Sequence, residues 1–474
     1  RKSSCSCSIQ HEKMADSITH THHQVPSPAH HPLQGDKPVH HGIYVPVVGK
    51  FSISLVWALL WMAFSIYIAQ DWLHDLGQVV GIVPAHLIIW GIAIIPGFMN
   101  AFLVAGLLLD RRPSVQHPEM ALPGITVLVA AYNEADNIAA TLDSIERQGY
   151  GGPLQVIVIN DGSTDGTADV LATCHHPWLE VLHLPHNVGK AQALNEGLSR
   201  ARWHLTVTVD GDSYLYRHAL ENLVRRYLSD PPNTRAVAGA VLVRNSRKNF
   251  VTEIQEWDYF HGIAAIKRLQ SLYQGTLVAQ GAFSIYDTTT LREVGGWPAT
   301  VGEDIVMTWQ MLEQGHRIGF AENACLFTNA PDTWRQFIHQ RQRWSRGLIE
   351  ALKLHWRLLF KRRMSTLFIW WNLLFPSLAL VYTLAYIPGI ILALFGIFWI
   401  VGPMTLLVLP LGLLINYLMY SVQIKMFTEQ GLKVRRNPLG FMGYALFYNL
   451  VLQPACVVGY VQEILNRTKQ WGTK

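Results

Sequence analysis

The sequence predicts an α/β domain held between membrane-spanning helices. Half of the 474 residues are hydrophobic and only 15% are charged, a composition typical of an integral membrane protein with one soluble domain. Apolar runs flank a central region in which short β-branched runs alternate with helix-forming stretches, the order typical of a mostly parallel sheet. The net charge of +5 is small, and it suits basic cytoplasmic loops better than a nucleic-acid partner.

Residues 1–45 are rich in His, Ser and Pro and have no apolar periodicity, so we expect a disordered tail. Its histidines could hold a metal ion, but a polar tail without fixed geometry is the simpler interpretation. The five cysteines of the chain are scattered, which predicts neither a disulfide framework nor a zinc site.

Two transmembrane helices are predicted within residues 46–110. Apolar runs begin at Phe51 and Val83, and each is long enough to cross a bilayer. The short acidic loop around Asp71 has no Lys or Arg, whereas two arginines follow the second run. Because cytoplasmic loops collect positive charge, we expect that loop outside and residues 111–345 in the cytoplasm.

About three further spans are expected in residues 367–464. Their apolar runs begin at the start of this range and near Met404 and Leu439. The first run contains two prolines, so it fits either one kinked helix or an interfacial segment followed by a span. Before these spans, residues 346–366 are basic and amphipathic, which predicts a helix lying on the bilayer. Residues 465–474 are expected to form a C-terminal tail.

Three short apolar runs rich in β-branched residues predict parallel strands at 125–130, 155–159 and 205–209. Helix-forming stretches occupy residues 135–147 and 189–201. Sheets of this kind bind ligands beyond the carboxyl ends of their strands. Polar residues follow the predicted strands there: Tyr132, Asn133, Glu134, Asp161, Asp210 and Asp212. Acids and amides brought to one edge by three strands favour a nucleotide site.

Asp210 and Asp212 are the candidate metal ligands. Side chains two residues apart in an extended chain point the same way, and paired carboxylates suit Mg²⁺ or Mn²⁺ beside a diphosphate. A lone Asp-x-Asp also occurs in ordinary turns, and Asp161 fits either a bond to a base or ribose or a strand-to-helix turn. Lys190 opens a predicted helix, where it either reaches a phosphate or lies at the surface. The chain has no phosphate-loop or dinucleotide fingerprint, which disfavours an ATPase or a dehydrogenase.

Glu303 and Asp304 follow a loop rich in Gly and Pro and open a predicted helix. Carboxylates at this position often stabilise the helix dipole. The functional interpretation is a general base that takes the proton of an attacking hydroxyl. A single base without a nucleophilic carboxylate partner is what an inverting sugar transfer requires, whereas a glycosidase needs a carboxylate pair.

The pentad from Gln340 to Trp344 lies on a predicted helix just before the membrane. Gln340, Arg343 and Trp344 fall on one face of that helix. Arginine can clamp a diphosphate and tryptophan can stack on a sugar ring. An interfacial anchor is the alternative, because Trp and Arg also collect at membrane surfaces.

In combination these motifs resemble the signature of the processive family 2 glycosyltransferases, which include cellulose, hyaluronan, chitin and poly-N-acetylglucosamine synthases. The resemblance covers residues 120–360 and rests on the order and spacing of Asp161, Asp210-Gly211-Asp212, Glu303-Asp304 and Gln340-x-x-Arg343-Trp344. It implies a GT-A fold, an inverting transfer from a UDP-sugar, and a polymer channel formed by the membrane helices.

The resemblance also assigns roles to individual residues. It implies that the nucleotide and the donor are held by Tyr132, Asn133, Glu134, Asp161, Lys190, Asp210, Gln340 and Arg343. It implies that the metal is bound by Asp210 and Asp212, that Asp304 is the general base, and that Glu303 and Trp344 hold the acceptor.

Within this group the chain is most similar to bacterial poly-β-1,6-N-acetylglucosamine synthases. This similarity rests on the residues at positions 256–260, 266–268 and 302–309. Two departures concern the sugar and the linkage rather than the transfer reaction. Gly302 stands where the group more often has Thr, and the segment 279–282 replaces the usual Ser-Gly start of the acceptor loop.

The sequence therefore predicts a multi-pass protein of the bacterial inner (plasma) membrane that polymerises UDP-N-acetylglucosamine and extrudes the product. Its expected partners are the UDP-sugar, the growing polysaccharide and the lipid bilayer, with no nucleic acid; the need for a small accessory membrane subunit stays open. The alternatives are a hyaluronan, chitin or cellulose-type synthase and a polyprenyl-phosphate glycosyltransferase. A non-catalytic membrane scaffold is disfavoured by the complete set of acids.

Overall fold

The structure is a computed structural model, and it describes residues 45–110, 120–402, 412–421 and 434–467 with a few single residues between the last two ranges. Residues from Pro46 onward form one compact unit. Nearly all of the expected N-terminal tail, much of the expected span that begins near Met404, and the last seven residues lie outside the described residues.

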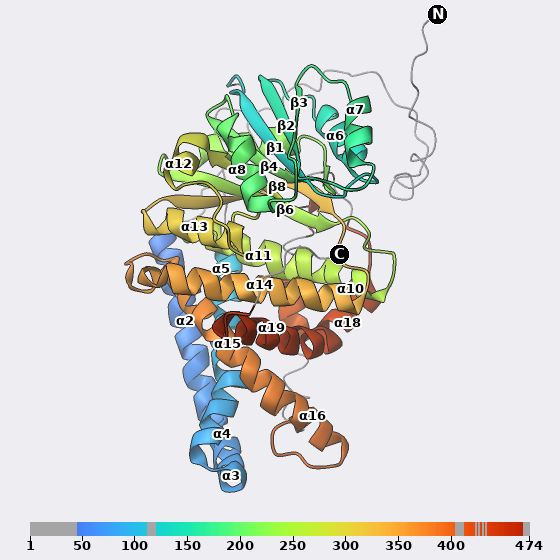
Figure 1. Ribbon diagram of the computed structural model, residues 1–474. Coiled ribbons are helices and arrows are strands. Elements are labelled where there is room, and N and C mark those ends of the chain that lie inside the picture. The colour runs from blue at the N-terminus through green and yellow to red at the C-terminus, as the bar shows by residue number, and fades with distance from the viewer. Residues whose placement is uncertain are drawn as a thin grey trace, which may run out of the picture. The chain divides into compact units, whose positions relative to one another are not determined.

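Eight strands of the described chain form one sheet in the order β3-β2-β1-β4-β7-β6-β8-β5 (Figure 1). Their bounds are β1 Ile125–Ala131, β2 Leu154–Asn160, β3 Leu179–His183, β4 Leu205–Asp210, β5 Tyr214–Leu215, β6 Thr234–Val243, β7 Phe283–Asp287 and β8 Arg317–Thr328. The three strands predicted from the sequence are β1, β2 and β4, each correct to within one residue at either end.

The half of the sheet made by β3, β2, β1 and β4 is parallel, as predicted, but β7 runs antiparallel to both of its neighbours. The sheet is therefore mixed rather than mostly parallel. Because β7 is antiparallel to β4, the start of β7 lies beside the carboxyl end of β4, where the amide of Asp210 donates to the carbonyl of Ala282 at 3.3 Å. The antiparallel strand thus brings the segment 279–282 to the edge that carries the predicted nucleotide site.

Helices cover both faces of the sheet. One apolar core joins alternate residues of β1 to α6 (Ile138–Glu146), α7 (Thr167–Thr173) and α9 (Ala219–Ser229). The other core joins the opposite face to α8 (Lys190–Ser199), α12 (Thr288–Glu293) and α13 (Glu303–Glu313). Strands buried on both faces are continuously apolar, which is why β1 and β2 show no alternation of polar and apolar residues.

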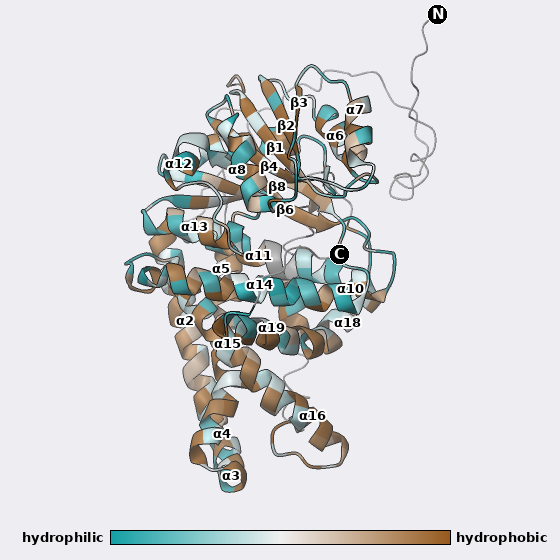
Figure 2. Cartoon of the chain, viewed as in Figure 1, coloured by the Kyte–Doolittle hydropathy of each residue, from teal (hydrophilic) through white to brown (hydrophobic). Residues whose placement is uncertain are grey.

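Four apolar helical stretches among the described residues are long enough to cross a membrane. They are α2 (Val47–Ile68), α4 to α5 (Ile82–Leu109), α15 to α16 (Thr366–Leu394) and α18 to α19 (Pro438–Ile464). Figure 2 shows that α2, α15 and α16 are predominantly apolar along their visible lengths. The second and third stretches continue through π-helical turns, so the two prolines of residues 367–400 interrupt no span.

The expected acidic loop around Asp71 is a helix, α3 (Gln70–Val80), that packs on α4. The indole N–H of Trp72 in α3 donates to the carbonyl of Trp399 at 3.0 Å. Trp399 lies just beyond the stretch that ends at Leu394, so the far ends of two apolar stretches meet at this point. Ile400 completes the contact by packing into the same apolar cluster as α3 and α4.

Helix α11 (Ala264–Leu272) connects the catalytic sheet to the apolar helices. Arg268 forms an ion pair with Asp110 at the end of α5, and the hydroxyls of Tyr273 and Ser54 lie 3.1 Å apart. The ring of Phe102 packs beside this contact, tilted against Tyr273 and edge-on to Phe368. The sheet and the apolar helices therefore share one packed core.

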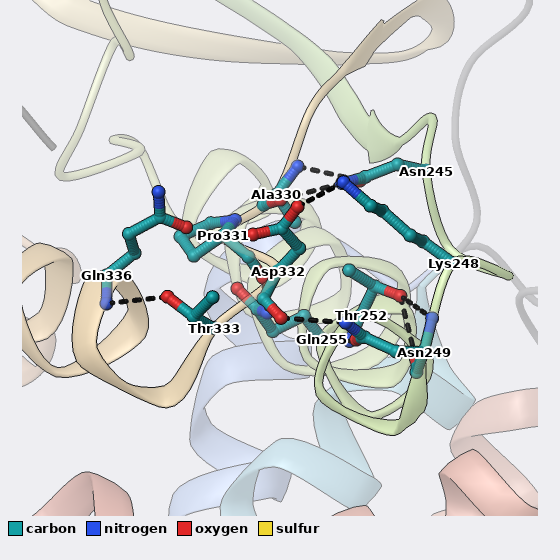
Figure 3. Close-up of polar contacts among 10 residues, drawn as sticks. All are labelled: Asn245, Lys248, Asn249, Thr252, Gln255, Ala330, Pro331, Asp332, Thr333 and Gln336. Carbon is teal, nitrogen blue, oxygen red and sulfur yellow. Dashed lines mark hydrogen bonds and ion pairs between the residues drawn. The ribbon is translucent and has the colours of Figure 1, made fainter. Parts of the chain in front are cut away.

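Helix α14 (Trp334–Leu354) carries the pentad and runs unbroken past the domain boundary expected at residue 345. A short 3₁₀ turn at Trp356–Phe360 follows, so the expected amphipathic segment 346–366 is divided between the two elements. Two contacts anchor the segment before α14 (Figure 3). The side chain of Asn245 donates to the carbonyl and accepts from the amide of Ala330. The side chain of Gln255 donates to the carbonyl of Pro331 at 2.7 Å.

Helix α19 (Asn449–Ile464) packs along α14 over most of its length. A Cβ on Gly459 would lie 2.5 Å from the carbonyl oxygen of Gln342, so glycine is what allows the two helices to approach. One turn later Glu463 forms an ion pair with Arg346 at 3.2 Å, although both side chains are buried. At the other end of the stretch, the carbonyl of Asn437 accepts from the indole of Trp257 at 2.9 Å.

Candidate functional site

The end of β1 is bonded to the turn that follows β2. Asn133 has a left-handed backbone with φ of 56°, which asparagine tolerates better than most residues. Its side-chain oxygen accepts from the amide of Thr164 at 2.9 Å, and its own amide donates to Ser163 at 3.0 Å. Glu134 accepts from Asn137 at 2.8 Å, while Tyr132 is 40% exposed. This corner therefore offers a half-open aromatic ring on a rigid turn.

Asp161 lies at the end of β2, where the sequence places it, and is 2% exposed. Its two oxygens accept from the backbone amides of Val188 at 2.8 Å and Gly189 at 3.0 Å. These bonds fix the residues that lead directly into α8. The described contacts of Asp161 are thus those of a turn-stabilising carboxylate, and they position Lys190, the first residue of α8.

Lys190 forms an ion pair with Asp210 at the end of β4. Burial by itself lowers the pKa of Lys190, but the carboxylates of Asp210, Glu303 and Asp304 outweigh it and hold that pKa above its usual value. The amine therefore stays cationic at neutral pH. A fixed cation beside three acids can bind an anionic group that approaches the strand ends.

Asp212 lies two residues beyond Asp210, with its Oδ1 at 3.4 Å from the hydroxyls of Ser213 and Thr328. The intervening Gly211 is held by its carbonyl, which accepts from Thr141 at 2.8 Å. In the part of the chain that the structure describes, no group of three or more His, Cys, Asp or Glu side chains could hold a metal by itself. Two carboxylates fit a divalent ion only if a ligand such as a diphosphate completes its shell.

Glu303 and Asp304 are the first two residues of α13. Glu303 is buried, and burial together with the charge of Asp304 raises its pKa to about 7, against the opposing effect of Lys190 and Arg343. The carboxylate of Asp304 accepts from the amide of Gly281 at 3.3 Å and from its neighbouring residue, Ile305, at 2.8 Å. The two acids thus lie between α8, α14 and the start of β7.

The position of α13 against α14 explains why the chain has Gly302 where threonine is more common. A Cβ on Gly302 would lie 2.5 Å from the Cα of Gly347, so the two helices touch backbone to backbone. The amide of Gly302 also donates to Glu350 of α14 at 3.0 Å. This contact sets the distance between Asp304 and the pentad.

Arg343 of the pentad acts electrostatically on Glu303, which links α14 to the acids of α13. Gln340 is buried, whereas Trp344 is 40% exposed and leaves part of its ring open. The sequence analysis assigned no role to Arg341, yet it is 4% exposed and its guanidinium lies 4.2 Å from the centre of the Trp344 ring. A terminal nitrogen of the Arg341 guanidinium also lies 2.9 Å from a carboxylate oxygen of Asp258. The two groups form an ion pair, but their angles do not meet those of a hydrogen bond.

The structure brings Lys190, Asp210, Glu303 and Asp304 together at one edge, with Arg343 close enough to act on Glu303. Tyr132, Asn133 and Glu134, which follow β1, lie instead beside the turn after β2. Two residues outside the predicted set, the buried Lys267 and the half-buried Gln280, are bonded to each other beside Asp304. The sequence analysis noted the segments 266–268 and 279–282 for their resemblance only and gave neither residue a role in the site.

Comparisons with known proteins agree with this geometry. Residues 123–347 match the model of a family described as "Glycosyltransferase like family 2". Over 271 residues the chain is 30% identical to a poly-beta-1,6-N-acetyl-D-glucosamine synthase of Staphylococcus aureus (strain MSSA476), a match that covers 54% of this chain and 64% of that protein. The enzyme of the same name from Staphylococcus epidermidis is 29% identical over 269 residues, with the same shares covered.

A solved structure of a mannosyltransferase from Pyrobaculum calidifontis, in complex with GDP-Man and Mn2+, is 18% identical and superposes with a TM-score of 0.54. The match covers 81% of this chain and 99% of that chain, and it shows a shared GT-A-like fold. The chain spans 64% of the length of the curated staphylococcal relatives. Residues 123–347 therefore match the family 2 glycosyltransferase model, and they contain a mixed GT-A-like sheet flanked by apolar helices.

Proposed function

We propose that the protein is a membrane-embedded, inverting and processive glycosyltransferase that builds a polysaccharide from a UDP-sugar. The observation that carries the proposal is the position of Asp304, held by the Gly281 amide beside Glu303 and the Lys190–Asp210 pair. UDP-N-acetylglucosamine is the proposed donor and poly-N-acetylglucosamine the product. The similarity to the staphylococcal synthases supports this choice.

The nucleotide would bind across the ends of β1 and β2. Tyr132 offers an exposed ring for a base, and the turn that Asn133 and Glu134 stabilise offers polar groups for the ribose. Asp161 takes part chiefly by holding the start of α8. Lys190 then faces the diphosphate.

Asp210 and Asp212 are the residues that would hold Mg²⁺ or Mn²⁺. Their two carboxylates at one strand end fit a hard cation whose remaining ligands come from the diphosphate. When bound, the ion would stabilise negative charge on the departing UDP. Lys190 and Arg343 add fixed positive charge at the same edge.

In the proposed reaction, Asp304 accepts the proton of an acceptor hydroxyl as its oxygen attacks the anomeric carbon of the donor. The new glycosidic bond forms on the face opposite the departing group, and the bond from the anomeric carbon to the UDP oxygen breaks. A single displacement inverts the configuration. The acceptor would be held by Glu303 and Trp344, with Gln340 and Arg343 holding the donor; the open part of the Trp344 ring suits a sugar face.

The polymer would leave through the apolar helices, in a bacterial plasma membrane, with the catalytic domain in the cytoplasm. We place the last apolar stretch differently from the sequence expectation. Its start bonds to Trp257 and its end pairs with Arg346, and both partners belong to the catalytic side. A helix that crossed the bilayer would separate its ends by about 30 Å of hydrocarbon. This stretch would therefore lie along the membrane surface.

Cysteine labelling tests this arrangement. Arg436→Cys and Asn466→Cys, in a background without native cysteines, should both react with a membrane-impermeant thiol reagent only after the cells are permeabilised. Asp75→Cys in α3 should react in intact cells. Labelling of Asn466→Cys in intact cells would instead support a crossing helix.

UDP release by the purified protein tests the proposed function. Protein in detergent would receive Mg²⁺ or Mn²⁺ and single UDP-sugars, and the products would be sized and their linkage determined. Release with UDP-N-acetylglucosamine alone, yielding a long polymer, is expected. Release only with a second sugar present would indicate hyaluronan-like synthesis, and a single sugar on a lipid phosphate would contradict processive synthesis.

Asp304→Asn tests the base. This variant should lose transfer while it still binds UDP, because the amide cannot accept the proton. Glu313→Gln, at the other end of the same helix, is the matched control and should keep its activity. Full activity of Asp304→Asn would exclude Asp304 as the base.

A further inference from the structure

Lys267 is a buried lysine that the proposed reaction does not use. It lies on α11, the helix that joins the catalytic sheet to the membrane helices, and it is 7% exposed. Its neighbour Arg268 points to Asp110 at the membrane side. Lys267 instead donates a hydrogen bond to the side-chain oxygen of Gln280. Burying an ammonium group is costly, so its position calls for a functional explanation.

Gln280 extends this contact across the acceptor loop. Its side-chain nitrogen donates to the carbonyl of Gly239 on β6 at 2.6 Å. Its side chain is therefore held at both ends, by α11 on one side and by the sheet on the other. Its backbone carbonyl is also engaged, accepting from the hydroxyl of Ser284 at 2.8 Å.

The residues on either side of Gln280 are bonded to α13. The amide of Ala279 donates to the hydroxyl of Thr308 at 2.9 Å, and that hydroxyl donates to the carbonyl of Asp304 at 2.6 Å. The amide of Gly281 donates to the Asp304 carboxylate at 3.3 Å. A displacement of Gln280 would therefore move the N–H group that orients the base.

The charges around Lys267 give it a second influence on the same carboxylate. Burial lowers the pKa of Lys267 to about 7, and Asp304 is the charged group that opposes this shift. Glu303 faces Asp304 on α13, Lys190 and Asp210 lie across the site, and Arg343 approaches from α14. The ring of Tyr286 on β7 is the remaining titratable group near Asp304. A protonated Lys267 therefore attracts the Asp304 carboxylate across the acceptor loop.

We propose that Lys267 and Gln280 act together as positioning residues for the acceptor loop and the base. Lys267 holds the Gln280 amide, Gln280 sets the position of the Gly281 N–H, and that N–H orients the Asp304 carboxylate. The pair thereby explains the departure at residue 280 from the usual Ser-Gly start: a longer side chain is present because a buried lysine binds it. The inference rests on the proposed function, since it gives Asp304 the role of base.

The test uses Lys267→Met, Gln280→Ser and the double variant in the full-length protein in detergent. UDP release is measured at saturating donor in one buffer near neutral pH. UDP affinity is measured for every variant. Lys361→Met, which removes an exposed lysine, is the matched control.

Each single variant should lower kcat about 10- to 100-fold, because small displacements of reacting groups have effects of that size. UDP affinity should stay within about threefold of the unaltered protein, since neither side chain belongs to the nucleotide corner. The double variant should lose no more than the worse single variant, because both changes break one chain of contacts.

Unchanged kcat in Gln280→Ser would overturn the inference, as would additive losses in the double variant. If Lys267→Met fails to bind UDP, Gln280→Ser decides: a loss of kcat with normal UDP affinity supports the inference. Failure of the proposed function is distinguishable, because the unaltered protein would then release no UDP with any donor.

Discussion

Arg341 is the residue whose removal most directly links stability to acceptor binding. Its guanidinium is 4% exposed and lies within cation–π distance of the rings of Phe337 at 4.9 Å, Trp344 at 4.2 Å and Tyr448 at 5.9 Å. It also pairs with Asp258 at 2.9 Å. Helix α14, the α18–α19 stretch and the segment after α10 (Phe250–Trp257) therefore meet at one buried cation.

Arg341→Met removes this cation and leaves the carboxylate of Asp258 without its ion pair. Breaking a buried pair costs about 3–5 kcal/mol, and each desolvated cation–π contact adds about 1–2 kcal/mol. Since methionine restores part of the packing, we expect a net loss of about 3 kcal/mol or more. For the compact unit Pro46–Lys474, with an unfolding entropy of about 2 cal/mol/K per residue, that corresponds to a fall in Tm of about 3 °C or more.

The assay is thermal unfolding in detergent, followed by UDP release and product sizing below the Tm. Trp344 loses the group that covers one of its faces, so the KM for a soluble oligosaccharide acceptor should rise and the polymer should shorten, with UDP affinity unchanged. Arg335→Met, at an exposed position of the same helix, is the control and should shift the Tm by less than about 2 °C. Equal Tm values and equal product lengths for Arg341→Met and this control would refute the argument.

Three further outcomes follow from the geometry. Gly302→Thr should lower both the Tm and kcat, because its Cβ would lie 2.5 Å from the Cα of Gly347 and push α13 away from α14. An unchanged Tm or an unchanged kcat would contradict this. Because the pKa of Glu303 is raised to about 7, folding favours its neutral form. Thermal stability should therefore be highest at acidic pH and should fall as the pH rises through about 7. Glu303→Gln should flatten this dependence in melting curves from about pH 5 to 8. Glu463→Gln should loosen α19 from Arg346 and raise its susceptibility to limited proteolysis, and an unchanged cleavage rate would argue against the buried pair as a clamp.

Local patterns were enough to predict the parallel half of the sheet. β1, β2 and β4 are short runs of buried residues, and hydrophobic periodicity reports burial directly. The polar residues after these strands could be assigned to one edge because parallel strands end on the same side. The proximity of Lys190 to Asp210 follows from the same rule, since α8 begins after β3 ends at the same edge of the sheet.

The features that the sequence did not reveal depend on contacts between distant segments. The direction of β7 is set by its pairing with β4 and β6, and nothing in the run Phe283–Asp287 distinguishes an antiparallel strand from a parallel one. Lys267 and Gln280 are separated by a turn and meet only because α11 packs under the acceptor loop. Arg341 belongs to the pentad but had no predicted partner, because Asp258 lies on another helix, far away in the sequence.

In the proposed surface arrangement, the α18–α19 stretch has the hydropathy of a span without crossing the membrane. Its 27 residues have the composition of a span and a length of about 40 Å, enough to cross the hydrocarbon core. Apolar composition, however, reports only that most side chains avoid water, and a helix between a protein surface and a lipid surface satisfies that condition as well. Glu463 and the close contact at Gly459 require α19 to follow α14, whose amphipathic sequence carries the pentad. The orientation of this helix is therefore fixed by one buried carboxylate and one missing side chain, two features that an averaged hydropathy value does not register.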